Sequence, residues 1–117
     1  MAYEQTFLWS LLITLLAEVP VVFALVRHRY KKSNTGDTIF AGIIASALTL
    51  PYFWFVLPAF ISERLPYVFL GESIIILVEA YIYHRLLKLS AKQAFVVSLC
   101  ANLASIAVGV IVSPMRI

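Results

Sequence analysis

The chain has 117 residues, of which 62% are hydrophobic and 13% are charged, and its net charge is +3. Soluble globular proteins are about half apolar and about a quarter charged, and a globule of this size cannot bury so large an apolar excess. This composition excludes an ordinary soluble domain. A nucleic-acid partner is not expected either, because the basic residues sit at the ends of apolar runs and form no stripe on a soluble face.

Four apolar runs follow one another along the chain, each long enough to cross a bilayer as a helix. A helix of about 20 residues spans the roughly 30 Å hydrocarbon layer. The predicted helices are residues 7–26, 39–61, 67–87 and 91–112. Because the connecting loops are short, the sequence predicts one transmembrane domain over residues 1–117, an all-α membrane protein with four transmembrane helices in an up-down bundle. Pro51 and Pro58 lack an amide N–H, so we expect a kink in the second helix.

The basic residues predict the orientation of this bundle. Seven of the nine flank the first and third loops, namely Arg27, Arg29, Lys31, Lys32, Arg85, Lys88 and Lys92. The positive-inside rule then places both loops in the cytoplasm and both termini outside (N-out/C-out), in the cell (inner or plasma) membrane. Aromatic residues at the same border, including Tyr81 and Tyr83, suit an interfacial belt.

Polar side chains recur at similar depths inside the apolar runs. Glu18, Thr49, Glu79 and Asn102 each lie near the middle of a different predicted helix. In an up-down bundle these residues can converge, and we call them the midplane polar cluster. Glu72 is an additional intramembrane acid, on the same face of the third helix as Glu79 and Tyr83 because seven and four residues are near multiples of a helical turn.

Two interpretations of this cluster stay open. A charged side chain at the centre of a bilayer costs at least a few kcal/mol, so buried acids need either a function or a partner. Glu18 and Glu79 have no base at their depth and would repel each other if both were ionised, which favours binding of a proton or cation. Alternatively, the acids are protonated and share hydrogen bonds with Asn102 and Thr49 that hold the helices together.

Small residues at four-residue spacing predict where helices approach each other closely. Gly42 and Ser46 mark such a face on the second helix, and Ala101, Ser105 and Gly109 mark one on the fourth. Small side chains let helix backbones approach in membranes. We therefore expect the second and fourth helices to pack on each other through these faces.

Enzymatic chemistry has little support in the sequence. There is no nucleophile beside a base, no glycine-rich phosphate loop and no set of residues at metal-ligand spacing, and Cys100 is the only cysteine. The sequence predicts no enzyme activity, no metal and no cofactor. His28 and His84 lie at the same ends of the first and third helices, so a bis-histidine haem site is a remote alternative.

Part of the sequence resembles known membrane proteins. Four helices with one Glu in the first, here in Leu16-Ala17-Glu18-Val19, are similar to the small multidrug resistance transporters, dimers that exchange protons for cationic drugs. The glycine-rich third helix of that family is missing here. More of the chain resembles a loosely defined group of uncharacterised prokaryotic four-helix integral membrane proteins, through Glu18-Val19-Pro20, Thr49-Leu50-Pro51, Glu72, Glu79-Ala80 and Ala101-Asn102. This likeness implies the architecture and no activity.

The sequence thus predicts a small noncatalytic membrane subunit or scaffold. We expect it to associate through its helices with copies of itself, as a homo-oligomer, or with other subunits of a larger membrane complex. The first alternative is a proton- or cation-coupled small transporter that uses the intramembrane carboxylates. The second is a haem-carrying membrane electron-transfer subunit, which would need His28 and His84 as ligands.

Overall fold

The computed structural model describes residues 3–52, 55 and 64–116, and for residues 3, 64–68 and 112–116 it describes the backbone alone. Within this part the chain forms four α-helices and no strand: α1 (Tyr3–Phe23), α2 (Thr35–Pro51), α3 (Arg64–Leu86) and α4 (Ala91–Arg116). α1 continues directly into a π-helical segment, η1 (Ala24–Arg29). The prediction of an all-α protein with four helices is confirmed.

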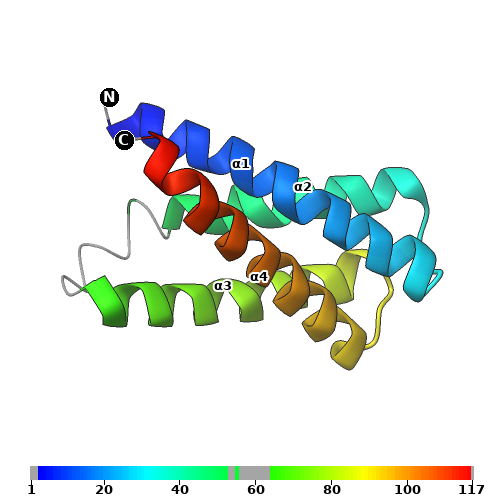
Figure 1. The fold of residues 1–117 in the computed structure, drawn as a ribbon. Coiled ribbons are helices and arrows are strands. Elements are labelled where there is room, and N and C mark those ends of the chain that lie inside the picture. The colour runs from blue at the N-terminus through cyan, green and yellow to red at the C-terminus, as the bar shows by residue number, and fades with distance from the viewer. Residues whose placement is uncertain (1–2, 53–54, 56–63, 117) are drawn as a thin grey trace.

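The helices run up and down, so that the start of α1 and the end of α4 lie together, opposite the α1–α2 and α3–α4 connections (Figure 1). We call the first of these ends the terminal end. We call the second the basic end, because it carries Arg27, Arg29, Lys31, Lys32, Arg85, Lys88 and Lys92. α4 packs against α1 and α3, and α2 packs against the same two helices, which places α2 and α4 diagonally across the bundle.

Several helix boundaries differ from the predicted ones by a few residues. The first helix was expected to stop at residue 26, but η1 carries it through Arg29, with the Tyr30 N–H donating to the carbonyl of Leu25 at 2.8 Å. The basic residues that end the first apolar run are therefore still part of the helix. The second helix was expected to reach residue 61; α2 spans Thr35–Pro51, the N–H of Tyr52 donates to the carbonyl of Thr49, Tyr52 and Phe55 are π-helical, and the rest of the predicted span lies outside the described residues. Pro58 and its predicted kink lie outside the described residues.

Polar side chains begin α2 and α4. The Asn34 side chain accepts a hydrogen bond of 2.7 Å from the N–H of Asp37, which starts α2 four residues before the predicted position. Ser90 and Gln93 form a reciprocal capping box at the start of α4, with two bonds of 3.1 Å. These caps satisfy amide groups that a helix start leaves without partners.

The two connections at the basic end are joined to each other. The Ser33 hydroxyl donates to the carbonyl of Leu87 at 2.7 Å, and the Arg27 guanidinium donates to the carbonyl of Ser33. Ser33 and Lys88 adopt positive φ angles of 57° and 56° in these connections. The hydrogen bond from Ser33 to Leu87 therefore joins the two connections at the basic end of the bundle.

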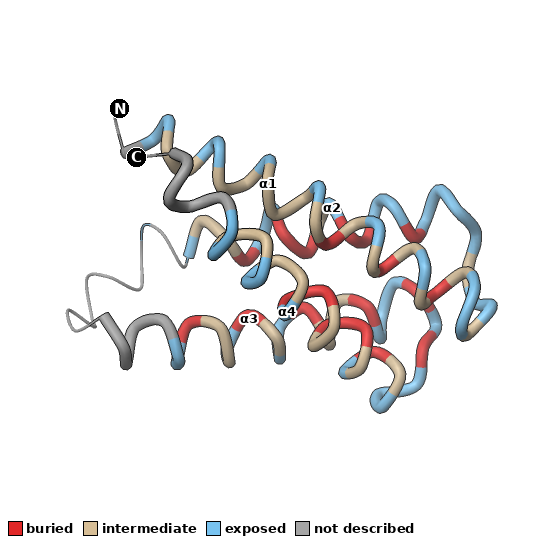
Figure 2. Tube along the Cα trace, in the orientation of Figure 1, coloured by how far each residue is buried: buried red, intermediate tan, exposed pale blue. Residues whose placement is uncertain are grey.

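Burial is uneven along the bundle. The buried apolar core lies in the basic half and the middle, and consists of Val22, Val26, Ala41, Ala45, Tyr83, Leu87, Leu89, Ala94, Val97 and Ala101. Figure 2 shows the buried segments concentrated there. Toward the terminal end, no described residue of α1 in the range 4–17 and none of α4 in the range 103–111 is buried. On α1 and α4 the described residues are therefore more deeply buried toward the basic end, whereas on α3 Gly71 and Ile75 are buried toward the terminal end.

The small-residue faces pack differently from the prediction. A Cβ atom on Gly42 would lie 3.2 Å from Cγ2 of Val19, so Gly42 allows α2 to approach α1. Ser105 also faces α1, where it hydrogen bonds to Glu18, and a Cβ on Gly109 would meet nothing within 4 Å. The prediction that the second and fourth helices pack on each other is wrong, because α1 and α3 lie between them.

Two helical stretches are long and apolar enough to cross a membrane. Among the described residues these are Glu4–Arg29 and Ala91–Ile111. The helix Thr35–Pro51 is apolar but shorter.

Candidate functional site

Glu79 of α3 lies at the centre of a hydrogen-bonded group of side chains from neighbouring helices. The Asn102 Nδ2 atom of α4 donates to Glu79 Oε1 at 2.8 Å, and the Thr49 Oγ1 atom of α2 lies 2.8 Å from Glu79 Oε2. Only 1% of Glu79 is exposed. The structure therefore brings Glu79, Asn102 and Thr49 of the midplane polar cluster into direct contact.

Glu18 of α1 joins the same group. Its Oε1 atom accepts a bond of 3.1 Å from the Ser46 hydroxyl, and its carboxyl also hydrogen bonds to Ser105 and lies close to the carboxyl of Glu79. Ser46 and Ser105 were assigned to helix packing, although Ser46 lies at the depth of Thr49, and their hydroxyl groups add a polar role to that assignment. We call Glu18 and Glu79 the carboxyl pair; every α-helix in the described chain contributes a side chain to its surroundings.

The contacts of Thr49 indicate that Glu79 of the carboxyl pair holds a proton. Thr49 has a single hydroxyl hydrogen, yet its Oγ1 atom lies 2.8 Å from both the carbonyl of Ala45 and Glu79 Oε2. A proton on Glu79 satisfies both contacts, because Glu79 then donates to Thr49 and Thr49 donates to Ala45.

A second layer of bonds holds Asn102 in place. Its Nδ2 group also donates to the carbonyl of Ser98 at 2.8 Å, and the Ser98 hydroxyl donates to the carbonyl of Ile76 at 2.7 Å. These bonds connect α4 to α3. Ser98 was not predicted as a site residue, although its position one helical turn before Asn102 is a signal for this role.

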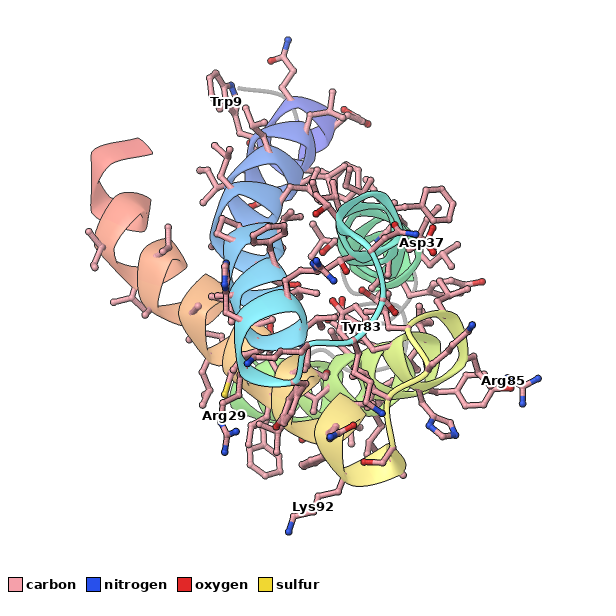
Figure 3. All side chains as sticks on the ribbon, turned by 90° about the vertical axis from the view of Figure 1, so that its right-hand side faces the viewer. Trp9, Arg29, Asp37, Tyr83, Arg85 and Lys92 are labelled. Atoms are coloured by element: carbon pink, nitrogen blue, oxygen red, sulfur yellow. The ribbon has the colours of Figure 1, made fainter. Side chains whose placement is uncertain are left out.

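Tyr83 is buried, contrary to the prediction that it belongs to an interfacial belt. Its exposed fraction is 0%, and within the described chain its hydroxyl group finds no hydrogen-bond partner. Figure 3, viewed from the basic end, shows Tyr83 inside the bundle, while Arg29, Arg85 and Lys92 point outward at its perimeter. Tyr83 lies close enough to both members of the carboxyl pair to interact with them electrostatically. Its place one turn after Glu79 was the available signal.

Glu72 stays apart from the cluster. It is half-buried, on the terminal side of Glu79, and close enough to Glu79 for an electrostatic interaction. Seven residues along a helix correspond to about 10 Å, which exceeds the reach of a direct hydrogen bond. Glu72 therefore lies between the carboxyl pair and the terminal end.

No basic side chain acts on the carboxyl pair within the described residues, where its electrostatic neighbours are acidic or neutral. The same residues contain no group of three or more His, Cys, Asp and Glu side chains that could hold a metal ion. His84 Nδ1 lies 2.6 Å from the carbonyl of Leu89, and the His28 ring packs edge-on against Phe23 at 5.6 Å between ring centroids. The polar chemistry of the interior is thus that of carboxyl, hydroxyl and amide groups.

Comparison with protein-family models, with curated proteins and with solved structures gave no match for this chain. The functional argument therefore depends on the geometry of the carboxyl pair and on the distribution of apolar and polar surface.

Proposed function

We propose that this chain is a multi-pass integral membrane protein with four transmembrane helices and with both termini outside. It acts as a noncatalytic subunit or scaffold that associates through its helices with copies of itself or with other membrane subunits. The observation that carries this proposal is that large apolar side chains face outward while acidic side chains are buried, the opposite of a soluble protein. Leu16, Leu77 and Val110 are 67%, 63% and 68% exposed, whereas Glu18 and Glu79 are at most 2% exposed. Such a surface is stable against lipid, because an apolar exterior needs no water.

The burial of the two longest apolar stretches supports the membrane assignment. Within Glu4–Arg29, only 17% of an 18-residue apolar stretch is buried inside the bundle, and within Ala91–Ile111 the corresponding share is 28%. A core helix of a soluble protein would be mostly buried. The longest dimension of the molecule is 40 Å, which suits a bilayer of about 40–45 Å including its headgroups.

The open face of α4 supports association. Gly109 has free space where a side chain would lie, and Val110 and Ile111 beside it are exposed. A helix of another chain could approach closely at this position, because glycine lets backbones come together in lipid.

The test is the mass of the protein purified in mild detergent and in nanodiscs. We expect an oligomer or a stoichiometric complex, and we expect Gly109→Ile to reduce it while helix content is unchanged. Ala107→Ile, which places the same side chain on another face of α4, is the matched control. A wild-type protein that is monomeric and alone in its native membrane would contradict the scaffold proposal.

A second candidate is a proton- or cation-coupled small transporter. It is favoured by the carboxyl pair, since two adjacent buried acids, with no base acting on them among the described residues, make a site for a positive charge. We expect proton flux in liposomes that Glu18→Gln and Glu79→Gln abolish and that the exposed control Glu4→Gln leaves unchanged. Absence of flux in every form, with intact folding, would rule out this candidate.

A further inference from the structure

The carboxyl pair lies at the level where the buried residues of α1 and α4 end, at Glu18 and Asn102. On its basic side, Val22, Val26, Leu87 and Leu89 are at most 2% exposed and fill the interior. On its terminal side, the ranges 4–17 and 103–111 contain no buried residue. On α3, Gly71 and Ile75 are buried on this side of Glu79, whereas Glu72 between them is half-buried, so Glu72 is the described acid of α3 that stays partly exposed there.

One face of α3 carries titratable groups on both sides of this boundary. Glu72, Glu79 and Tyr83 are separated by seven and four residues, so their side chains project from the same face. Glu72 is half-buried on the terminal side of the carboxyl pair, and Tyr83 is fully buried on its basic side. Along this face, Glu72 lies toward the terminal end, Glu79 of the carboxyl pair lies in the middle and Tyr83 lies toward the basic end.

The Tyr83 hydroxyl indicates that something polar binds beside the carboxyl pair. A buried hydroxyl without a hydrogen-bond partner costs about 1–3 kcal/mol, and such groups are ordinarily satisfied by protein or water. Tyr83 has no partner within the described chain, although it lies near both carboxyls. A water molecule suits this position, because it can accept from the tyrosine and donate to a carboxyl oxygen.

We propose that the carboxyl pair and the Tyr83 hydroxyl together bind one exchangeable proton with a water molecule, and that Glu72 passes this proton to and from solvent at the terminal end. The inference deepens the transporter candidate by naming the proton as the bound species. In loading, a proton leaves the Glu72 carboxyl, travels through water and forms an O–H bond on an ionised member of the pair. Solvent then reprotonates Glu72, so the step consumes only one external proton.

The groups that face this site come from each packed helix. α1 supplies Glu18 and α3 supplies Glu79, Glu72 and Tyr83; α2 and α4 supply only the neutral side chains Ser46, Thr49, Asn102 and Ser105. The histidines His28 and His84 are exposed at the basic end. Exchange should therefore depend on Glu72 and Tyr83, and not on the basic residues.

The experiment uses the full chain in proteoliposomes and follows the infrared carbonyl-stretch band of the protonated carboxyls after transfer from H₂O to D₂O. We expect Glu72→Gln to slow the exchange of this band roughly a hundredfold, since a positioned side chain accelerates proton transfer by at least that factor. Its position should not change, because Glu72 does not touch the pair. Tyr83→Phe should instead shift the band, because it removes a group that binds beside the pair.

The controls are Glu4→Gln, an exposed acid at the terminal end, and Tyr81→Phe, an exposed tyrosine of α3; both should behave as wild type. Circular dichroism checks that each variant keeps its helices, and Glu72→Asp, which retains an acid, should restore much of the rate.

The inference is overturned if Glu72→Gln and Tyr83→Phe leave the band and its exchange unchanged. It is equally overturned if Na⁺ or K⁺ at constant pH displaces the band, because the site would then bind a metal cation. Exchange without transmembrane flux would remove the transporter candidate and leave this site in place.

Discussion

Asn102 Nδ2 and Glu79 Oε1 lie 2.8 Å apart, and this hydrogen bond joins α4 to α3 in the interior of the bundle. The same nitrogen donates to the carbonyl of Ser98, so both N–H groups of the amide are used. Glu79 in turn contacts Thr49 of α2 and Glu18 of α1. One carboxyl group therefore connects all the α-helices that the structure describes.

Replacing Asn102 with Ala should destabilise the protein. The substitution removes a donor from a buried carboxyl, and interhelical hydrogen bonds of this kind contribute about 0.6–2 kcal/mol in lipid. The measurement is the free energy of unfolding in detergent micelles. Leu103→Ala, on the exposed side of the same helix, should cost less, and an equal loss from both variants would argue against a structural role for the amide.

Gly42 and Gly109 should respond oppositely to added bulk. A side chain at Gly42 would press on Val19 of α1, so Gly42→Val should cost about 1–3 kcal/mol through overpacking. Gly109→Val meets open space and removes a helix-weakening glycine, so the monomer should be unchanged or more stable. Thermal unfolding of the two variants in the same detergent checks this contrast, which fails if Gly109→Val is the more damaging change.

Lys88 should tolerate glycine better than alanine. Its φ of 56° lies in the left-handed region, which costs a residue with a Cβ atom about 1 kcal/mol or more relative to glycine. Lys88→Gly and Lys88→Ala remove the same charge, so their difference isolates the backbone effect. We expect Lys88→Gly to be the more stable by about 1 kcal/mol in chemical denaturation. Equal stabilities would show that the connection relaxes when the side chain is shortened.

Much of the architecture follows from the apolar runs. Their length and spacing predicted four helices, and the chain forms them. The similar depths of Glu18, Thr49, Glu79 and Asn102 could be predicted in the same way. In antiparallel helices with short connections, residues at equal distances from the loops lie at the same height in the bundle.

Other features could not be obtained from depth alone. Tyr83 and Tyr81 stand at nearly the same height, yet one is buried and the other is 63% exposed, because the outcome depends on which face of α3 its neighbours cover. The diagonal placement of α2 and α4 could not be predicted either, because it also depends on which helix faces pack together. The start of α2 at Thr35 was missed because the Asn34 cap, and not hydrophobicity, determines it.

The central claim, that these helices cross a membrane with the basic end in the cytoplasm, is tested most directly by cysteine labelling in intact cells. In a Cys100→Ala background, single cysteines are placed at Glu4 on the terminal end and at Lys32 and Lys92 on the basic end, all exposed positions. We predict that a membrane-impermeant maleimide labels Glu4→Cys in intact cells and reaches Lys32→Cys and Lys92→Cys only after the cells are opened. Labelling of Lys32→Cys in intact cells, or a chain that stays in solution without detergent, would contradict the account.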